Sequence, residues 1–155
     1  MNPRNILALV VLYLLVEAAP VLSHCEVPCG VYGDDARFSA MEEDLKTLEK
    51  AMSQIARLVG KDDAQSANQL ARWVGTKEEH ANKLQQVVSQ YFMTQRLKVP
   101  AADAGDAAIA VYTDKLVLLH KILRGAMKCK QTVDAGQVET VRVLVHEFRH
   151  AYEIK

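Results

Sequence analysis

The sequence predicts an all-α protein whose four helices pack as an antiparallel bundle. Four stretches of the chain carry apolar residues three and four positions apart, which is the period of an amphipathic helix. The 7 glycines and 4 prolines are sparse and concentrated in particular places, which favours helices over strands and turns. Half of the 155 residues are apolar, enough for the core of one domain but not of two. Short connections between amphipathic helices favour an antiparallel order.

The first half of the chain predicts two helices. The first should end at Gly60, and its apolar stripe is Phe38, Met41, Leu45, Leu48, Met52, Ile55 and Val59. The second should begin after residues 61–63, and its stripe is Leu70, Trp73, Leu84, Val87, Val88 and Tyr91. Gly75 interrupts this stripe, and Thr76 to Glu79 has the pattern of a capping box. A kink, or two collinear helices, is therefore expected near Gly75.

The second half predicts two more helices after a linker at residues 99–105. The third helix should end near Lys130, and its stripe is Ile109, Tyr112, Leu116, Leu119, Ile122 and Leu123. A turn at residues 132–135 should lead into the fourth helix, whose stripe is Val138, Val141, Val145, Phe148 and Tyr152. Cys129 lies near the end of the third stripe, where a small buried hydrophobic residue is the expected role.

Residues 1–23 have the features of a cleaved secretory signal. Arg4 opens a short positive region, and residues 6–16 form an apolar run that is shorter than the ~20 residues of a membrane-spanning helix. Val21 and Ser23 then stand at the third and first positions before a predicted cut. The alternative is an uncleaved membrane anchor.

Cleavage after Ser23 predicts an exported protein, in the periplasm, a lumen or the extracellular space. Its mature domain is residues 24–155, with no membrane span after processing. The chain has 19 basic and 19 acidic residues, hence no net charge, so nothing in the composition favours nucleic acid as a partner. Small molecules or other protein chains are the expected partners.

His24, Cys25 and Cys29 form a potential metal-binding hook at the new amino terminus. The terminal amine, the Cys25 amide nitrogen and the Cys25 thiolate can close two fused chelate rings around one metal. The turn at Pro28 brings the Cys29 thiolate to the fourth corner. A planar set of two nitrogens and two sulfurs favours Ni(II) or Cu(II) over Zn(II), which prefers a tetrahedron. The His24 imidazole remains free to bind along the axis, and the thiolates and amide make Ni(III) accessible.

Residues 24–32 read His-Cys-Glu-Val-Pro-Cys-Gly-Val-Tyr. This string resembles the nickel-hook motif of nickel-dependent superoxide dismutases, His-Cys-x-x-Pro-Cys-Gly-x-Tyr. The resemblance implies one nickel ion per subunit, with His24, Cys25 and Cys29 as ligands and Tyr32 over the substrate approach. It also implies a homohexamer of four-helix bundles that converts superoxide to dioxygen and hydrogen peroxide by Ni(II)/Ni(III) cycling.

The match departs from the family at the residues that support the axial histidine. In the family these are a glutamate of the first helix and an arginine. Ungapped counting from His24 places Ala40 at the position of the glutamate, with Glu42 and Glu43 just beyond. The arginine has no assigned counterpart, so neither role is transferred to a residue of this chain.

A competing metal motif lies in the last predicted helix. Residues 146–150 read His-Glu-Phe-Arg-His, which fits the H-E-x-x-H pattern of zinc peptidases. Only residues 151–155 follow, and the core stripe turns His146 and His150 to the opposite face of the helix. A solvated or intersubunit face is therefore the preferred interpretation. His80 and His120 are single helical histidines with no predicted ligand role.

Three alternatives remain open. The chain could be a non-catalytic exported bundle that binds nickel or copper for storage or transfer, and redox turnover would separate this from the enzyme. Cys25 and Cys29 could form a disulfide in an oxidising compartment. Tyr32 could simply pack the hook onto the first helix, because a tyrosine ring is amphipathic.

Overall fold

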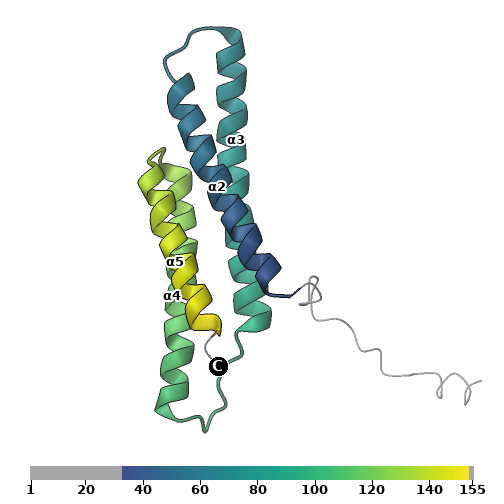
Figure 1. Ribbon diagram of the computed structural model, residues 1–155, viewed down its shortest axis with the longest axis vertical. Coiled ribbons are helices and arrows are strands. Elements are labelled where there is room, and N and C mark those ends of the chain that lie inside the picture. Colours follow the sequence, from purple (N-terminus) through teal and green to yellow (C-terminus); the bar gives the residue numbers. More distant parts are fainter. Residues whose placement is uncertain (1–32, 154–155) are drawn as a thin grey trace, which may run out of the picture.

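The computed structural model describes residues 33–153, and this part of the chain is helical apart from short connections and contains no strand. Its elements, in chain order, are α2 (Asp35–Leu58), α3 (Ala64–Gln86), η1 (Val87–Arg96), α4 (Asp106–Gln131) and α5 (Ala135–Glu153). Because η1 continues α3 without a break, these elements make four long rods that alternate in direction (Figure 1). The predicted all-α bundle is confirmed.

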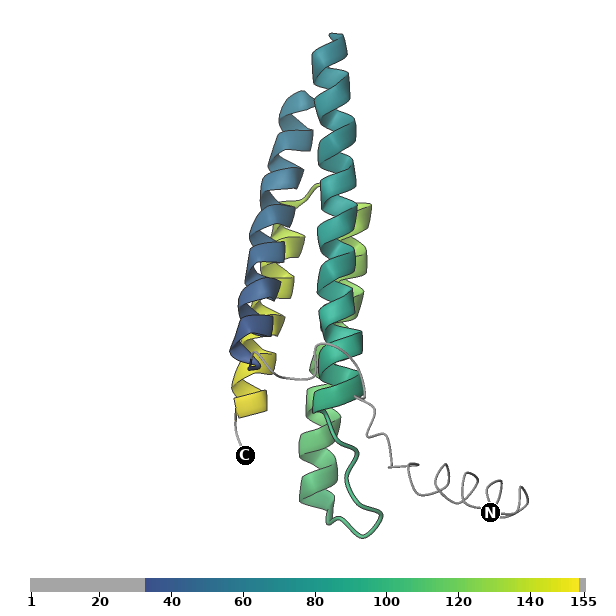
Figure 2. The same cartoon turned by 90° about the vertical axis from the view of Figure 1, so that its right-hand side faces the viewer.

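The four rods surround one core. α2 packs against α3 and α5, and α4 packs against the same two neighbours from the other side. The turn between α2 and α3 reaches past α4 and α5 at one end, while the first turns of α4 reach past the other helices at the opposite end (Figures 1 and 2). Within residues 33–153, no helix is both long and apolar enough to cross a bilayer.

The predicted stripes supply most of the core. Its buried residues are Phe38, Met41, Leu45, Leu48, Met52, Ala81, Leu84, Val88, Tyr91, Phe92, Leu119, Ile122, Ala126, Cys129, Val138, Val141, Val145 and Phe148. The stripes fail at their outer ends, where Val59 is 66% exposed and Ile109 is 47% exposed. Val59 lies in the turn that follows the end of α2 at Leu58, and Ile109 lies in the first turn of α4, on the part that extends past the other helices (Figure 2), so no neighbouring helix covers either residue.

The interruption predicted at Gly75 is wrong, because α3 continues through this residue. Thr76 does not cap a new helix, since its Oγ1 donates back to the Arg72 carbonyl oxygen at 3.0 Å. An exposed glycine inside a helix costs only about 1 kcal/mol relative to alanine. Packing of the long rod against α2 and α4 outweighs that cost.

The irregularity lies further along, in the π-helical segment η1. Side chains follow the wider i to i+5 spacing, with Thr94 Oγ1 donating to the Ser89 carbonyl at 2.7 Å and Gln95 Nε2 donating to the Gln90 carbonyl at 2.9 Å. The adjacent residues Tyr91 and Phe92 of this segment are both buried. Segments of π-helix occur frequently at functional sites, which directs attention to this end of the bundle.

Cys129 has the structural role predicted for it. It is fully buried in the core, and burial raises the pKa of its thiol to about 11. The end of α4 beside it is capped by a buried lysine of α3. Lys77 Nζ donates to the carbonyl oxygens of Cys129 and Thr132, each at 3.3 Å, and to that of Lys130. The amine therefore satisfies carbonyls that the end of a helix leaves without partners.

Removing this cap should destabilise the bundle. Lys77→Met keeps the aliphatic stem but leaves three carbonyl oxygens without their donor, so we expect the free energy of unfolding to fall by about 1–3 kcal/mol. The matched control is Lys83→Met, because Lys83 is exposed and pairs with Glu79 on the surface at 2.7 Å, where an ion pair contributes little to stability. Urea unfolding of both variants tests this, and equal midpoints would contradict the capping role.

Candidate functional site

The predicted metal ligands lie outside the described residues. His24, Cys25, Cys29 and Tyr32 all precede Gly33, where the structure begins, and so does the predicted signal at residues 1–23. Their roles therefore stay predictions. The structure does show the surface on which the chain enters the bundle, directly after Tyr32.

Asp34 is the central residue of that entry point. The first turn of α2, the end of η1 and the last turn of α5 lie at the same end of the bundle (Figure 1). Tyr91 OH donates to Asp34 Oδ1 at 2.5 Å, while Tyr152 OH and Arg96 Nη2 donate to Asp34 Oδ2, each at 2.8 Å. One carboxylate thus joins the start of α2 to η1 and α5, an arrangement that we call the Asp34 clamp.

The electrostatics of the clamp favour its hydrogen-bonded state. Burial alone would raise the pKa of Asp34, but the hydrogen bonds from Arg96, Tyr91 and Tyr152 outweigh it and lower the pKa. Burial, together with the Asp34 charge, raises the pKa of Tyr91 to about 12. The carboxylate therefore stays charged and the phenol stays protonated near neutral pH, so each keeps its role as acceptor or donor.

Tightly packed aromatic rings support the clamp from the core side. Phe38 lies 4.9 Å from Phe92 and 5.9 Å from Phe148, measured between ring centroids. Tyr152 lies 5.5 Å from Phe92 with its ring edge-on. These rings come from α2, η1 and α5, the same three elements that the clamp connects, and their contacts fix the orientation of the tyrosine donors.

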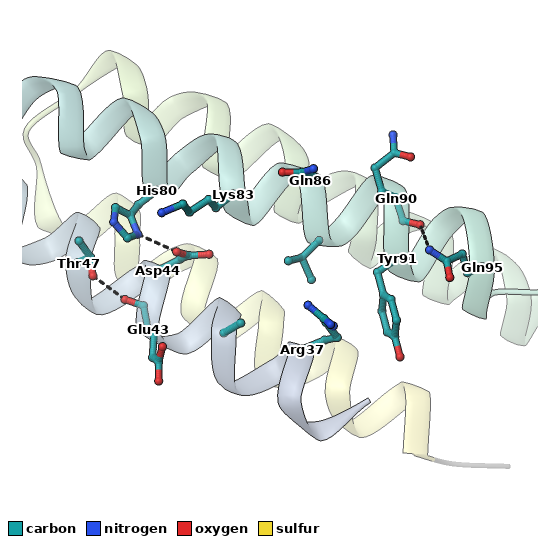
Figure 3. Close-up of a pocket in the computed structure, with 12 residues that line it drawn as sticks. Arg37, Glu43, Asp44, Thr47, His80, Lys83, Gln86, Gln90, Tyr91 and Gln95 are labelled. Atoms are coloured by element: carbon teal, nitrogen blue, oxygen red, sulfur yellow. Dashed lines mark hydrogen bonds and ion pairs between the residues drawn. The ribbon is translucent and has the colours of Figure 1, made fainter. Parts of the chain in front are cut away.

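A cavity of about 490 Å³ lies between α2 and the α3–η1 rod (Figure 3). Its wall contains a carboxylate–imidazole pair between the buried Asp44 and the half-buried His80, in which His80 Nδ1 lies 2.7 Å from Asp44 Oδ1. Burial raises the pKa of Asp44, although its hydrogen bond to His80 partly opposes this. Tyr91 lines the same cavity and also donates to Asp34, so it belongs both to the cavity wall and to the Asp34 clamp. His80 is therefore a paired residue rather than an isolated one.

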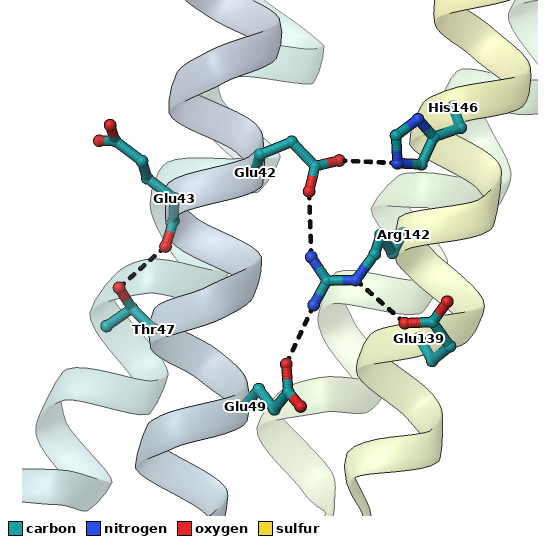
Figure 4. Close-up of polar contacts among 7 residues, drawn as sticks. All are labelled: Glu42, Glu43, Thr47, Glu49, Glu139, Arg142 and His146. Atoms are coloured by element: carbon teal, nitrogen blue, oxygen red, sulfur yellow. Dashed lines mark hydrogen bonds and ion pairs between the residues drawn. The ribbon is translucent and has the colours of Figure 1, made fainter.

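The structure separates the residues considered for the family glutamate. Ala40 and Glu43 line the cavity. Glu42 turns the other way, where its Oε2 accepts from Arg142 Nη1 at 3.0 Å and its Oε1 lies 3.4 Å from His146 Nε2 (Figure 4). Glu42 is thus part of a charged contact between α2 and α5, and Ala40 brings no carboxylate to the cavity.

The zinc-peptidase motif does not assemble a metal site in the described part of the chain. His146 and His150 are both exposed on α5, as predicted. No group of three or more histidine, cysteine, aspartate or glutamate side chains converges to hold a metal ion anywhere in residues 33–153. His120 is likewise an exposed residue of α4.

Comparison with known families decides the identity. Residues 19–155 match the family described as nickel-containing superoxide dismutase. The chain belongs to this family. It is therefore an oxidoreductase that contains nickel and acts on superoxide, and the alternative of a non-catalytic metal carrier is set aside. No curated protein and no solved structure matches the chain.

The residues of the Asp34 clamp had no recognisable signal in the sequence of this superoxide dismutase. An aspartate just before a helix predicts an N-cap, yet Asp34 makes no capping hydrogen bond with its side chain. Tyr91 and Tyr152 were identified only as members of apolar stripes. Their hydroxyl groups donate to Asp34, which is far away in sequence. The periodicity of apolar residues gives no information about such contacts.

Proposed function

We propose that the nickel of this superoxide dismutase is bound by the hook at residues 24–29, after cleavage between Ser23 and His24. In this proposal the amine of His24, the amide nitrogen of Cys25 and the thiolates of Cys25 and Cys29 are the planar donors. The His24 imidazole is the axial donor. Family membership over residues 19–155 supports it, because the match includes the whole hook.

The state of the cysteines supports the same assignment. The chain has three cysteines, and Cys129 is buried in the core with its thiol pKa raised to about 11. A thiol of that pKa stays protonated near neutral pH, whereas metal binding requires the thiolate. Cys25 and Cys29 are the two cysteines that precede the bundle, and their donor set fits a planar nickel ion.

The chain's own groups have distinct tasks in this mechanism. Nickel in such a site supplies one-electron cycling between Ni(II) and Ni(III), so that one superoxide is oxidised to dioxygen and the next, with two protons, is reduced to hydrogen peroxide. The Cys25 and Cys29 thiolates donate the electron density that lowers the potential. His24 would hold the metal through its imidazole and stabilise the oxidised state, and Tyr32 would restrict the approach of substrate.

We also propose that the mature protein is exported and forms a homohexamer, as the family resemblance implies. Uncovered apolar side chains support self-association. Val59 is exposed in the α2–α3 turn and Val74 on α3, and Ile109 and Val111 are exposed on the first turns of α4, which extend past the neighbouring helices. Contact with other subunits would remove these side chains from water.

Replacing the axial ligand tests the hook most directly. His24→Ala keeps the terminal amine and every planar donor, so Ni(II) should still bind with the absorption spectrum of a planar dithiolate complex. Turnover should fall by more than the roughly 10- to 100-fold that loss of a residue supporting a ligand costs, because the missing donor matters mainly in one oxidation state and therefore acts differentially along the reaction. The measurement is nickel per subunit beside the dismutation rate.

The two readouts separate the possible roles of His24. If nickel content and rate fall together, His24 acts mainly as an anchor for the metal. If neither falls, the imidazole is not a ligand and the proposed axial position is wrong. His120→Ala is the control, because this exposed histidine lies on α4 and should leave both values unchanged.

A further inference from the structure

From the Asp34 clamp and the backbone of Gly33 we infer a positioning device for the metal site. We propose that together they set the direction in which the chain leaves the bundle toward residues 24–32, and so hold the ligands in the geometry needed for turnover. This inference rests on the proposed function, because it takes the hook as the nickel site. Asp34 and Gly33 contact neither metal nor substrate in this proposal.

The clamp is built to fix a chain segment rather than to cap a helix. Asp34 receives three side-chain hydrogen bonds, from Tyr91, Arg96 and Tyr152, at 2.5–2.8 Å. These donors come from two other elements, so Asp34 is held from two directions. Hydrogen bonds to a charged acceptor are roughly twice as strong as those between neutral groups. The position of Asp34 is therefore fixed relative to the whole bundle, not only to α2.

Gly33 carries this fixed position one residue further toward Tyr32. Its φ of 76° lies in the left-handed region, which residues with a Cβ rarely adopt. No heavy atom lies within 4 Å of the place where a Cβ would be. A side chain would therefore fit at this position, and it is the positive φ of the backbone that favours glycine. Because Gly33 directly precedes Asp34, whose position is fixed, its backbone conformation sets the direction in which the chain leaves the bundle.

Asp34 is close enough in sequence to the proposed site residues to affect their positions. Asp34 lies five residues after Cys29 and two after Tyr32, so a change in the exit direction moves both. Misplacement of reacting groups by about 1 Å can cost on the order of 100-fold in rate. A clamp of this kind would explain why the aspartate beside the hook has more donors than an ordinary N-cap.

Two substitutions test the device by different routes. Asp34→Asn keeps the shape of the side chain but removes the charge and turns one acceptor into a donor facing other donors. Gly33→Ala strains the exit turn without a steric clash. In both variants every nickel ligand remains, so nickel content should stay close to that of the wild type. We expect the dismutation rate per bound nickel to fall roughly tenfold to a hundredfold.

Matched controls lie close by in the chain. Asp35→Asn changes the adjacent aspartate, whose side chain is 84% exposed and pairs with Arg149. Gly60→Ala introduces the same kind of strain at the other end of α2, where φ is 84° and a Cβ would also meet nothing within 4 Å. Both controls should keep the wild-type rate per nickel.

A spectroscopic readout separates positioning from stability. The electron paramagnetic resonance spectrum of the oxidised nickel centre should change in Asp34→Asn and Gly33→Ala but not in the controls, while thermal unfolding and circular dichroism report the fold. If Asp34→Asn does not fold, Gly33→Ala decides alone. Rates per nickel within twofold of the controls, with an unchanged spectrum, would overturn the proposal. Full activity of Cys25→Ser would instead refute the hook itself, whatever the clamp variants show.

Discussion

Cys25→Ser and Cys29→Ser should each abolish dismutation while leaving the bundle folded. Each change removes one of the two thiolates that make Ni(III) accessible in the proposed site. Loss of a residue that only supports a metal ligand already costs about 10- to 100-fold, so loss of a ligand itself should exceed that range. The bundle should persist because its core is formed by residues 38–148. Rate, nickel per subunit and circular dichroism are the measurements.

Two controls show whether the loss of activity is specific to the cysteines of the proposed hook. Cys129→Ala removes the third thiol from the core, and should lower stability while leaving the rate per folded, nickel-loaded subunit unchanged. His146→Ala combined with His150→Ala removes the zinc-peptidase motif from an exposed face and should also preserve the rate. An inactive double variant would reopen the question of a metal site on α5. A cysteine variant of the hook with wild-type rate would refute the assignment of ligands.

The fold was predictable from the sequence because the bundle depends on periodicity. Apolar residues at helical spacing identify which face of each rod is buried, and most stripe residues from Phe38 to Phe148 lie in the core. The prediction failed where an apolar residue at helical spacing is exposed instead of buried. Val59 lies in the turn after α2 ends, and Ile109 lies where α4 extends past its neighbours. No local pattern indicates where a helix loses its partner.

The irregular features follow from tertiary contacts. Gly75 is a plausible helix breaker in isolation, but packing along the rest of α3 keeps the helix continuous. The π-helical turns of η1 carry no sequence signature comparable to a proline or a cap, and they place Tyr91 both in the cavity wall and in the Asp34 clamp. Each outcome depends on residues many positions away, so local propensity could not predict it.

The residues of the candidate site differ in how far the sequence could predict them. The proposed hook could be predicted because its chemistry would need adjacent residues in one short string, with a spacing that the fused chelate rings would impose. The surroundings were not recognisable, because Asp34, Tyr91, Arg96 and Tyr152 are joined only by the fold. Ala40 shows the same limit. A linear count assigns it to the position of the family glutamate, and the structure places it beside a cavity to which it brings no carboxylate.

A single extra residue before His24 should inactivate the enzyme. In the proposed mature chain, which would begin at His24, one residue would carry both the amine donor and the imidazole donor. An added alanine converts the His24 nitrogen to an amide and moves the new amine one residue away, so the planar donors and the imidazole can no longer bind in the same arrangement. We expect the rate to fall by more than about 100-fold, as for loss of a ligand, with the bundle intact.

The experiment compares mature protein that starts at His24 with protein that carries one alanine before it, at equal nickel loading conditions. Adding an alanine after Lys155 is the control for a change in length, and should have no effect on rate. Mass spectrometry of the exported wild-type protein should find His24 as its first residue, because Val21 and Ser23 match the pattern that signal peptidases accept. An active protein with a different first residue would show that the amine of His24 is not a nickel donor, and cleavage would then serve export alone.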